Sequence, residues 1–119
     1  MINEQLGLVE RRFAEIIWEN EPVSSTKLVA LAAEALKWKK STTYTVLKKL
    51  CEKGFFQNKD SIVTSIISKE DYLASSSYGF VEESFNGSLP AFVAAFSAIH
   101  KITDKERNEI LKIIGVKNG

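Results

Sequence analysis

The chain of 119 residues has few of the groups that enzymes and cross-linked proteins use: one histidine, one cysteine and two prolines. A single cysteine excludes an intrachain disulfide and is typical of a reducing compartment. The sequence contains neither a glycine-rich phosphate loop nor a cluster of metal-ligating residues. We therefore expect a protein that is not an enzyme and that needs no metal or other cofactor.

Long apolar runs are also missing. No run reaches the length of a membrane span, and the first residues, MINEQLGLVERR, lack the basic-then-apolar order of a signal peptide. These features favour a soluble, cytoplasmic protein. The length suits one domain, or one small domain with an appended helical piece, and allows a core without cross-links.

The lone histidine and the lone cysteine are both interpreted as structural. His100 ends an apolar helical segment, where a role in capping the helix is favoured over that of a catalytic base. Cys51 lies beside the apolar stripe of its helix, so packing is favoured over redox sensing. Lys48 and Lys53 nearby would only modestly favour a thiolate.

Positive charge is concentrated in one stretch. Residues 37–59, KWKKSTTYTVLKKLCEKGFFQNK, contain seven lysines and one acid, although the net charge of the chain is only +1. The stretch reads as a helix whose inward stripe is formed by Thr43, Val46, Leu47 and Leu50. Hydroxyls and one tyrosine lead the opposite face and lysines follow, as in a helix that enters a DNA major groove. A solvated, lysine-rich surface helix is the alternative.

The context of this helix favours the DNA-binding interpretation. A first amphipathic helix is predicted over about Leu8 to Asn20, and Ser24 is the expected N-cap of a second. Gly54 follows the basic helix as a C-terminal glycine, and two strand-like runs, Phe55–Gln57 and Ile62–Ile67, flank a turn at 58–61. Three short helices, the third basic, followed by a hairpin are the order of a winged helix-turn-helix. Trp18 lies off the stripe of the first helix and is expected to cover another element, such as the helical tail.

Three further amphipathic helices are predicted after residue 68. Capping boxes at Ser68 and Thr103 and a cap at Ser88 with Pro90 open them. Their stripes are too few to close a core alone, so we predict a dimerisation arm. Its predicted interface residues are Tyr78, Val81, Phe85, Phe92, Phe96, Ile110, Leu111 and Ile114. The alternative is that these helices fold back on the N-terminal part as one monomeric core. The fold class is thus mainly α (α+β), with a winged helix-turn-helix over residues 1–68 and a helical arm over 69–119.

At this point the chain resembles the penicillinase-repressor (BlaI/MecI) family of bacterial transcriptional regulators, over about residues 8–114. The resemblance rests on Glu10 with Ile16-Ile17-Trp18, on Val23-Ser24, on TTYTVLKKLCEKG from Thr42 to Gly54, and on the hairpin. Phe85-Asn86-Gly87-Ser88 and the late T-x-x-E helix extend it into the arm.

The resemblance implies a homodimeric repressor on a palindromic operator. It implies base-facing roles for Ser41, Thr42, Tyr44 and Thr45, and phosphate contacts from Lys48, Lys49 and the wing residue Lys59, to which we add Lys40 at the start of the helix. It also implies relief of repression by a proteolytic cut at Ala95–Phe96, downstream of a membrane metalloprotease receptor that senses β-lactams. Relatives have Asn-Phe at this bond and often a more basic wing. The rival hypothesis is a winged-helix module that binds protein without specific DNA binding.

Overall fold

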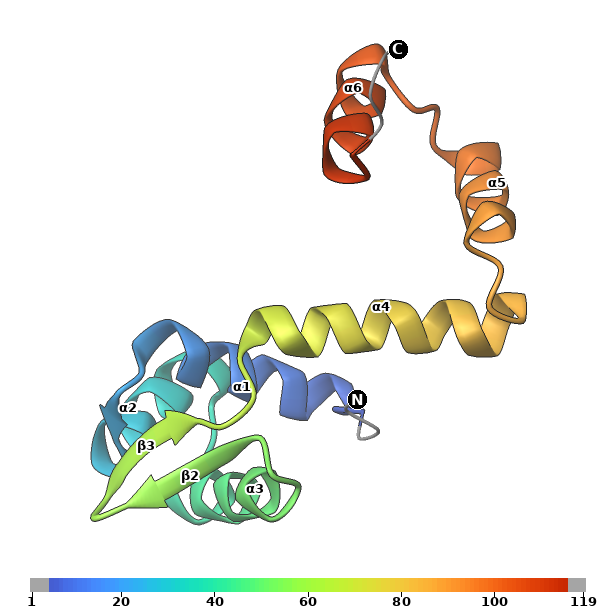
Figure 1. Cartoon of the computed structure of the whole chain (residues 1–119). Coiled ribbons are helices and arrows are strands. Elements are labelled where there is room, and N and C mark those ends of the chain that lie inside the picture. Colours follow the sequence, from blue (N-terminus) through green and yellow to red (C-terminus); the bar gives the residue numbers. More distant parts are fainter. Residues whose placement is uncertain (1–4, 116–119) are drawn as a thin grey trace. The chain divides into compact units, whose positions relative to one another are not determined.

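The computed structural model of the protein describes residues 5–115, which fall into two compact units divided after Ser77. The first unit contains α1 (Leu8–Asn20), β1 (Val23–Ser24), α2 (Ser25–Leu36), α3 (Lys40–Glu52), β2 (Phe56–Lys59) and β3 (Ile62–Ser65). It also contains the beginning of α4 (Lys69–Phe85), so the division lies inside that helix. Three helices and a hairpin in this order confirm the predicted winged helix-turn-helix (Figure 1).

The sheet of the first unit is antiparallel and has the order β1-β3-β2. The hairpin register pairs Phe56 with Ser65 and Lys59 with Ile62. The short strand β1, which the sequence did not predict, pairs Val23 with Val63 on the other edge of β3. This strand ties the wing to the start of α2.

The core of the first unit is built from the predicted inner faces of its helices and from the hairpin. Phe13, Ile17, Leu28, Leu50 and Phe55 are fully buried there. Ser24 accepts a hydrogen bond from the Lys27 amide and thus caps α2 as expected. Gly54 has a φ of +85°, a left-handed conformation that favours glycine and lets the chain leave α3 for the hairpin.

The turn of the hairpin is shorter than the sequence suggested. Residues 58–61 were predicted to form the turn, but Asn58 and Lys59 are paired with Val63 and Ile62 in the ladder. Positive φ angles at Asp60 and Ser61 make the connection in two residues. The second strand ends at Ser65 and not at Ile67, because the amides of Ile66 and Ile67 both donate to the Phe55 carbonyl.

Trp18 covers the junction between the hairpin and α4. Its indole Nε1 donates to the Ile67 carbonyl at 3.0 Å. Its ring lies 5.6 Å from that of Phe56 and 5.8 Å from that of Tyr72, between centroids. Tyr72 is only 4 % exposed, so the first turns of α4 pack into the first unit. Lys69 adds an ion pair to Glu15 of α1 at 2.7 Å, which is the main reason why the pKa of Glu15 lies below its ordinary value.

The second unit contains the end of α4, α5 (Leu89–Ile99) and α6 (Asp104–Ile113). Ser88 caps α5, and Thr103 with Glu106 forms the predicted capping box of α6. At Ser68 only half of the predicted box forms, with the Ser68 hydroxyl accepting from the Asp71 amide. Neither α5 nor α6 has a fully buried side chain within the described residues.

We expect Trp18→Phe to lower the free energy of unfolding by about 1–3 kcal/mol, because it leaves the Ile67 carbonyl without its donor. Urea unfolding followed by circular dichroism measures the loss. Trp38→Phe is the control: Trp38 packs on Phe13 with centroids 5.1 Å apart, and its indole donates to no described residue. A loss for Trp18→Phe no larger than that for Trp38→Phe would contradict a role for the indole bond.

Candidate nucleic-acid interface

The inner face of α3 fixes the direction of its outer face. Thr43, Leu47 and Leu50 are buried, with exposures of 0–2 %. The Thr43 hydroxyl is satisfied within the helix, where it donates to the Lys39 carbonyl at 3.2 Å. Because these three side chains pack into the core of the first unit, with Val46 partly buried beside them, the side chains on the opposite side of the helix face solvent.

The predicted base-facing residues, Ser41, Thr42, Tyr44 and Thr45, all lie on the exposed face of α3. Two of their hydroxyls already have partners. Thr45 donates to the Ser41 carbonyl at 2.9 Å, which leaves its oxygen free to accept, and Tyr44 donates to the Ser25 hydroxyl of α2 at 3.4 Å. Tyr44 therefore leans toward the start of α2. Ser25, which the sequence did not single out, positions it.

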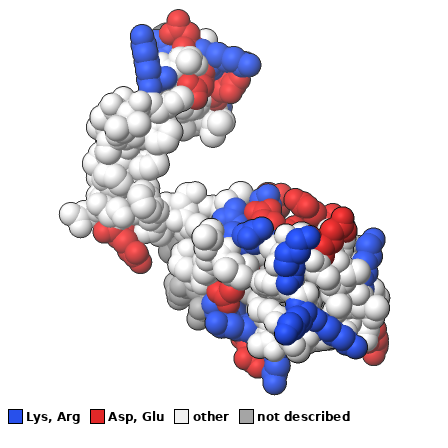
Figure 2. All heavy atoms as spheres, turned by 180° about the vertical axis from the view of Figure 1, so that it is seen from behind, with Lys and Arg blue, Asp and Glu red and all other residues white. Residues whose placement is uncertain are grey.

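The predicted phosphate contacts differ in their surroundings. Lys40 and Lys48 are exposed and form no ion pair with another described residue. Lys49 is exposed too, but its Nζ lies 3.7 Å from Oε2 of Glu10. On the face drawn in Figure 2, lysine and arginine side chains are spread over the first unit, whereas α5 contains no charged residue.

The wing is held firmly but carries little charge. Lys59 is exposed at the end of β2, beside the exposed turn residue Asp60. At the base of the hairpin, the Glu21 carboxylate accepts from both the amide and the hydroxyl of Ser65 at 2.8 Å. Glu21 follows α1, and sequence reasoning missed its role because Ser65 lies 44 residues further along the chain.

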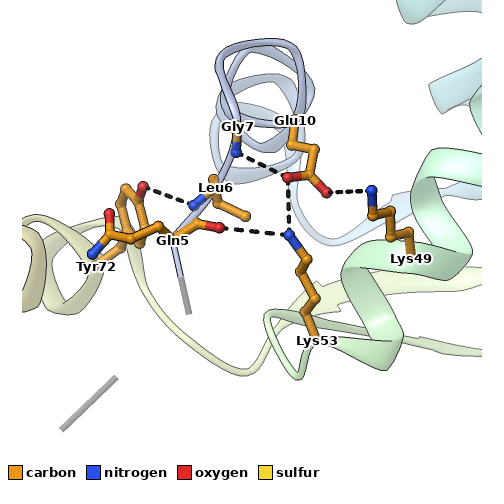
Figure 3. Close-up of polar contacts among 7 residues, drawn as sticks. All are labelled: Gln5, Leu6, Gly7, Glu10, Lys49, Lys53 and Tyr72. Carbon is orange, nitrogen blue, oxygen red and sulfur yellow. Dashed lines mark hydrogen bonds and ion pairs between the residues drawn. The ribbon is translucent and has the colours of Figure 1, made fainter. Parts of the chain in front are cut away.

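Glu10 joins the start of α1 to the C-terminal end of α3 (Figure 3). Its Oε1 accepts from the Gly7 amide at 2.9 Å and from Lys53 Nζ at 3.0 Å. The bond from Gly7 and the neighbouring lysines lower the pKa of Glu10, although burial acts in the opposite direction. Lys53 also donates to the Gln5 carbonyl, and the Leu6 amide donates to the Tyr72 hydroxyl. Sequence reasoning identified Glu10 only as part of a family pattern and did not predict these contacts.

Cys51 and His100 have the structural surroundings that were predicted. Cys51 is half-buried against the core, and burial, with a smaller effect of Glu52, raises the pKa of its thiol. The neighbouring lysines therefore do not favour a thiolate. His100 is the C-terminal cap of α5, and its Nε2 lies 3.1 Å from both carboxylate oxygens of Glu106.

The predicted arm residues lie on a partly open apolar surface of the second unit. Rings of Phe80, Phe85, Phe92 and Phe96 follow one another at centroid distances of 5.6–6.1 Å. A groove of about 200 Å³ is lined by Phe92, Phe96 and Ile110, among others. Val81, Phe85, Phe92 and Leu111 are half-buried. Tyr78, Phe96, Ile110 and Ile114 remain 45–62 % exposed.

Two other kinds of site were sought in the part of the chain that the structure describes. Residues 5–115 hold no group of three or more histidine, cysteine or acidic side chains placed to bind a metal ion. None of their helices combines the length and the apolar content that crossing a bilayer requires.

Comparison with known proteins agrees with these features. The sequence model of the family described as penicillinase repressor matches residues 6–115. The penicillinase repressor of Bacillus licheniformis is 23 % identical over 114 residues, which cover 92 % of this chain and 89 % of that protein. The match spans α1 to α6, including the exposed face of α3. The chain therefore belongs to the penicillinase repressor family.

Proposed function

We propose that the protein is a transcriptional repressor that binds a palindromic DNA operator as a homodimer. Membership of the penicillinase repressor family supports transcription regulation by DNA binding. The observation that carries the proposal for this chain is the exposed face of α3. It presents hydroxyls at its N-terminal end and lysines further along, on a helix whose other face is locked in the core.

In the proposed complex α3 lies in the major groove. Ser41, Thr42, Tyr44 and Thr45 are close to base edges, where short donors and acceptors discriminate between base pairs. Lys40, Lys48 and Lys49 contact phosphates, as does Lys59 at the end of β2. Asp60 beside Lys59 makes the contribution of the wing smaller than that of α3.

The open apolar surface of the second unit supports the homodimer. Ile99, Ile113 and Ile114 are 93 %, 81 % and 62 % exposed. A second copy would cover this surface and provide the two-fold symmetry that a palindrome requires. The proposed interface is made by Tyr78, Val81, Phe85, Phe92, Phe96, Ile110, Leu111 and Ile114.

We further propose that a proteolytic cut at Ala95–Phe96 relieves repression. The bond lies inside α5, where both residues are exposed and no described side chain is fully buried. A protease can therefore reach the helix after local unfolding that breaks few contacts. The cut would separate α6 from the first unit. The upstream membrane metalloprotease receptor remains a prediction from the family resemblance.

The proposed function is tested by selecting bound fragments from a pool of random duplex DNA. We expect a palindrome whose half-sites lie about one duplex turn, or a multiple, apart. Affinity for the selected duplex should fall steeply with salt, since each phosphate contact releases counterions. No enrichment, together with duplex binding that is weak or insensitive to salt, would favour the protein-binding module instead.

We expect Thr45→Ala to reduce the preference for the selected operator over random duplex by about 1–3 kcal/mol, because Thr45 offers its oxygen to a base edge. Fluorescence anisotropy with both duplexes measures this preference. Lys48→Ala is the contrasting variant and should weaken both duplexes alike. Equal losses on both duplexes for Thr45→Ala would remove Thr45 from the base-reading set.

We expect Phe96→Asp to make the protein sediment as a monomer and lose tight operator binding, since an unpaired charge in an apolar interface is costly to bury. A chain ending at Ala95 should behave similarly and keep the first unit folded. Ser97→Asp is the matched control, because Ser97 is an exposed polar residue of the same helix. A Phe96→Asp variant that stays dimeric and holds the operator would show that α5 is not in the interface.

A further inference from the structure

Two adjacent lysines of α3 lie in different electrostatic surroundings. Lys48 is exposed and has no acidic partner among the described residues. The side chain of Lys49 is 62 % exposed, yet its Nζ lies 3.7 Å from Oε2 of Glu10 in α1. Lys53, one turn further along, lies on the same side of α3 and also meets Glu10 (Figure 3).

Burial and hydrogen bonds hold the Glu10 carboxylate beside these lysines. Its side chain is 13 % exposed, and Oε1 has two donors, one of them the Gly7 amide at the start of α1. Its Oε2 is buried and accepts no hydrogen bond, and the cation paired with this oxygen is the Lys49 ammonium at 3.7 Å. A fixed, buried carboxylate oxygen beside a largely exposed lysine is unlike the mobile ion pairs of a protein surface.

We propose that Glu10 positions the C-terminal end of α3 through Lys53 and competes with DNA phosphate for Lys49. The inference rests on the proposed DNA binding. Lys48 then makes the full backbone contact of this helix, while Lys49 makes a reduced one, because its charge is partly neutralised before DNA arrives. The acid thereby limits the affinity of α3 for any duplex, whereas the hydroxyl-rich N-terminal end of α3 still reads the operator.

The substitution Glu10→Gln removes the negative charge of Glu10 and can keep the hydrogen bonds that position α3. The amide oxygen of glutamine can accept from Gly7 and Lys53 as Oε1 does, while the amide nitrogen takes the place of Oε2 beside Lys49. Removing an acid from a protein that binds DNA raises its affinity in a general way as well. The matched control is therefore Glu19→Gln, the same charge change on α1 at an exposed residue without an ion pair among the described residues.

The experiment measures the affinity of the full chain for a random 20-base-pair duplex over a range of salt concentrations. We expect Glu10→Gln to bind about two- to fivefold more tightly at low salt, because the lysine of the competing pair is largely exposed and its attraction to Glu10 is screened by water. The salt slope should steepen by up to about one phosphate contact. Glu19→Gln should raise the affinity less than Glu10→Gln does. When Lys49 is already alanine, adding Glu10→Gln should raise the affinity by no more than Glu19→Gln does in the wild-type chain.

Each other outcome is decisive. If a folded Glu10→Gln variant binds duplex more weakly, Glu10 has a structural role only. If Glu10→Gln raises the affinity just as much in the Lys49→Ala background, the effect is one of general charge. Either result overturns the inference. If Glu10→Gln does not fold, Lys49→Ala must still cost less affinity than Lys48→Ala, and an equal or larger cost overturns it. A wild-type chain that binds no duplex overturns the proposed function itself, and the inference with it.

Discussion

The burial of one face of α3 is the constraint on which the proposed interface depends. Thr43, Leu47 and Leu50 pack into the core, and this orientation turns the hydroxyls and lysines on the opposite side of the helix outward. The same core fixes the hairpin, because the Phe55 carbonyl accepts from the amides of both Ile66 and Ile67. A rigid scaffold of this kind keeps the groups that we propose to meet DNA in place before binding, which would lower the entropic cost of the complex.

The two units differ in how far they bury their apolar side chains. In the first, a continuous set of fully buried side chains forms the core, and even Tyr72 of α4 is buried against it. In the second, Phe96 and Ile110 line an open groove, and Ile113 is largely exposed. Surfaces of this kind are typical of interaction sites. In the proposed homodimer, affinity for a palindrome would thus depend on contacts far along the chain from α3.

Local patterns were enough to predict most helices, because stripes and caps such as Ser24 and Thr103 act within a few residues. The exposed face of α3 followed from the same periodicity. Contacts distant in sequence could not be predicted: β1 exists because Val23 pairs with Val63, and Glu10 meets Lys53 only in the folded chain. The interface of the arm, including Phe96, stays a prediction, since it concerns a second copy of the chain.

The most direct measurement of the central claim is amide hydrogen exchange of the full chain with and without a selected operator duplex. If α3 reads DNA, added protection should be concentrated in residues 40–52 and at the β2–β3 turn, with the core of α1 unchanged. Protection confined to α1 and α2, or to the second unit alone, would contradict the placement of α3 in the groove. Absence of any protection at saturating duplex would contradict DNA binding by this surface.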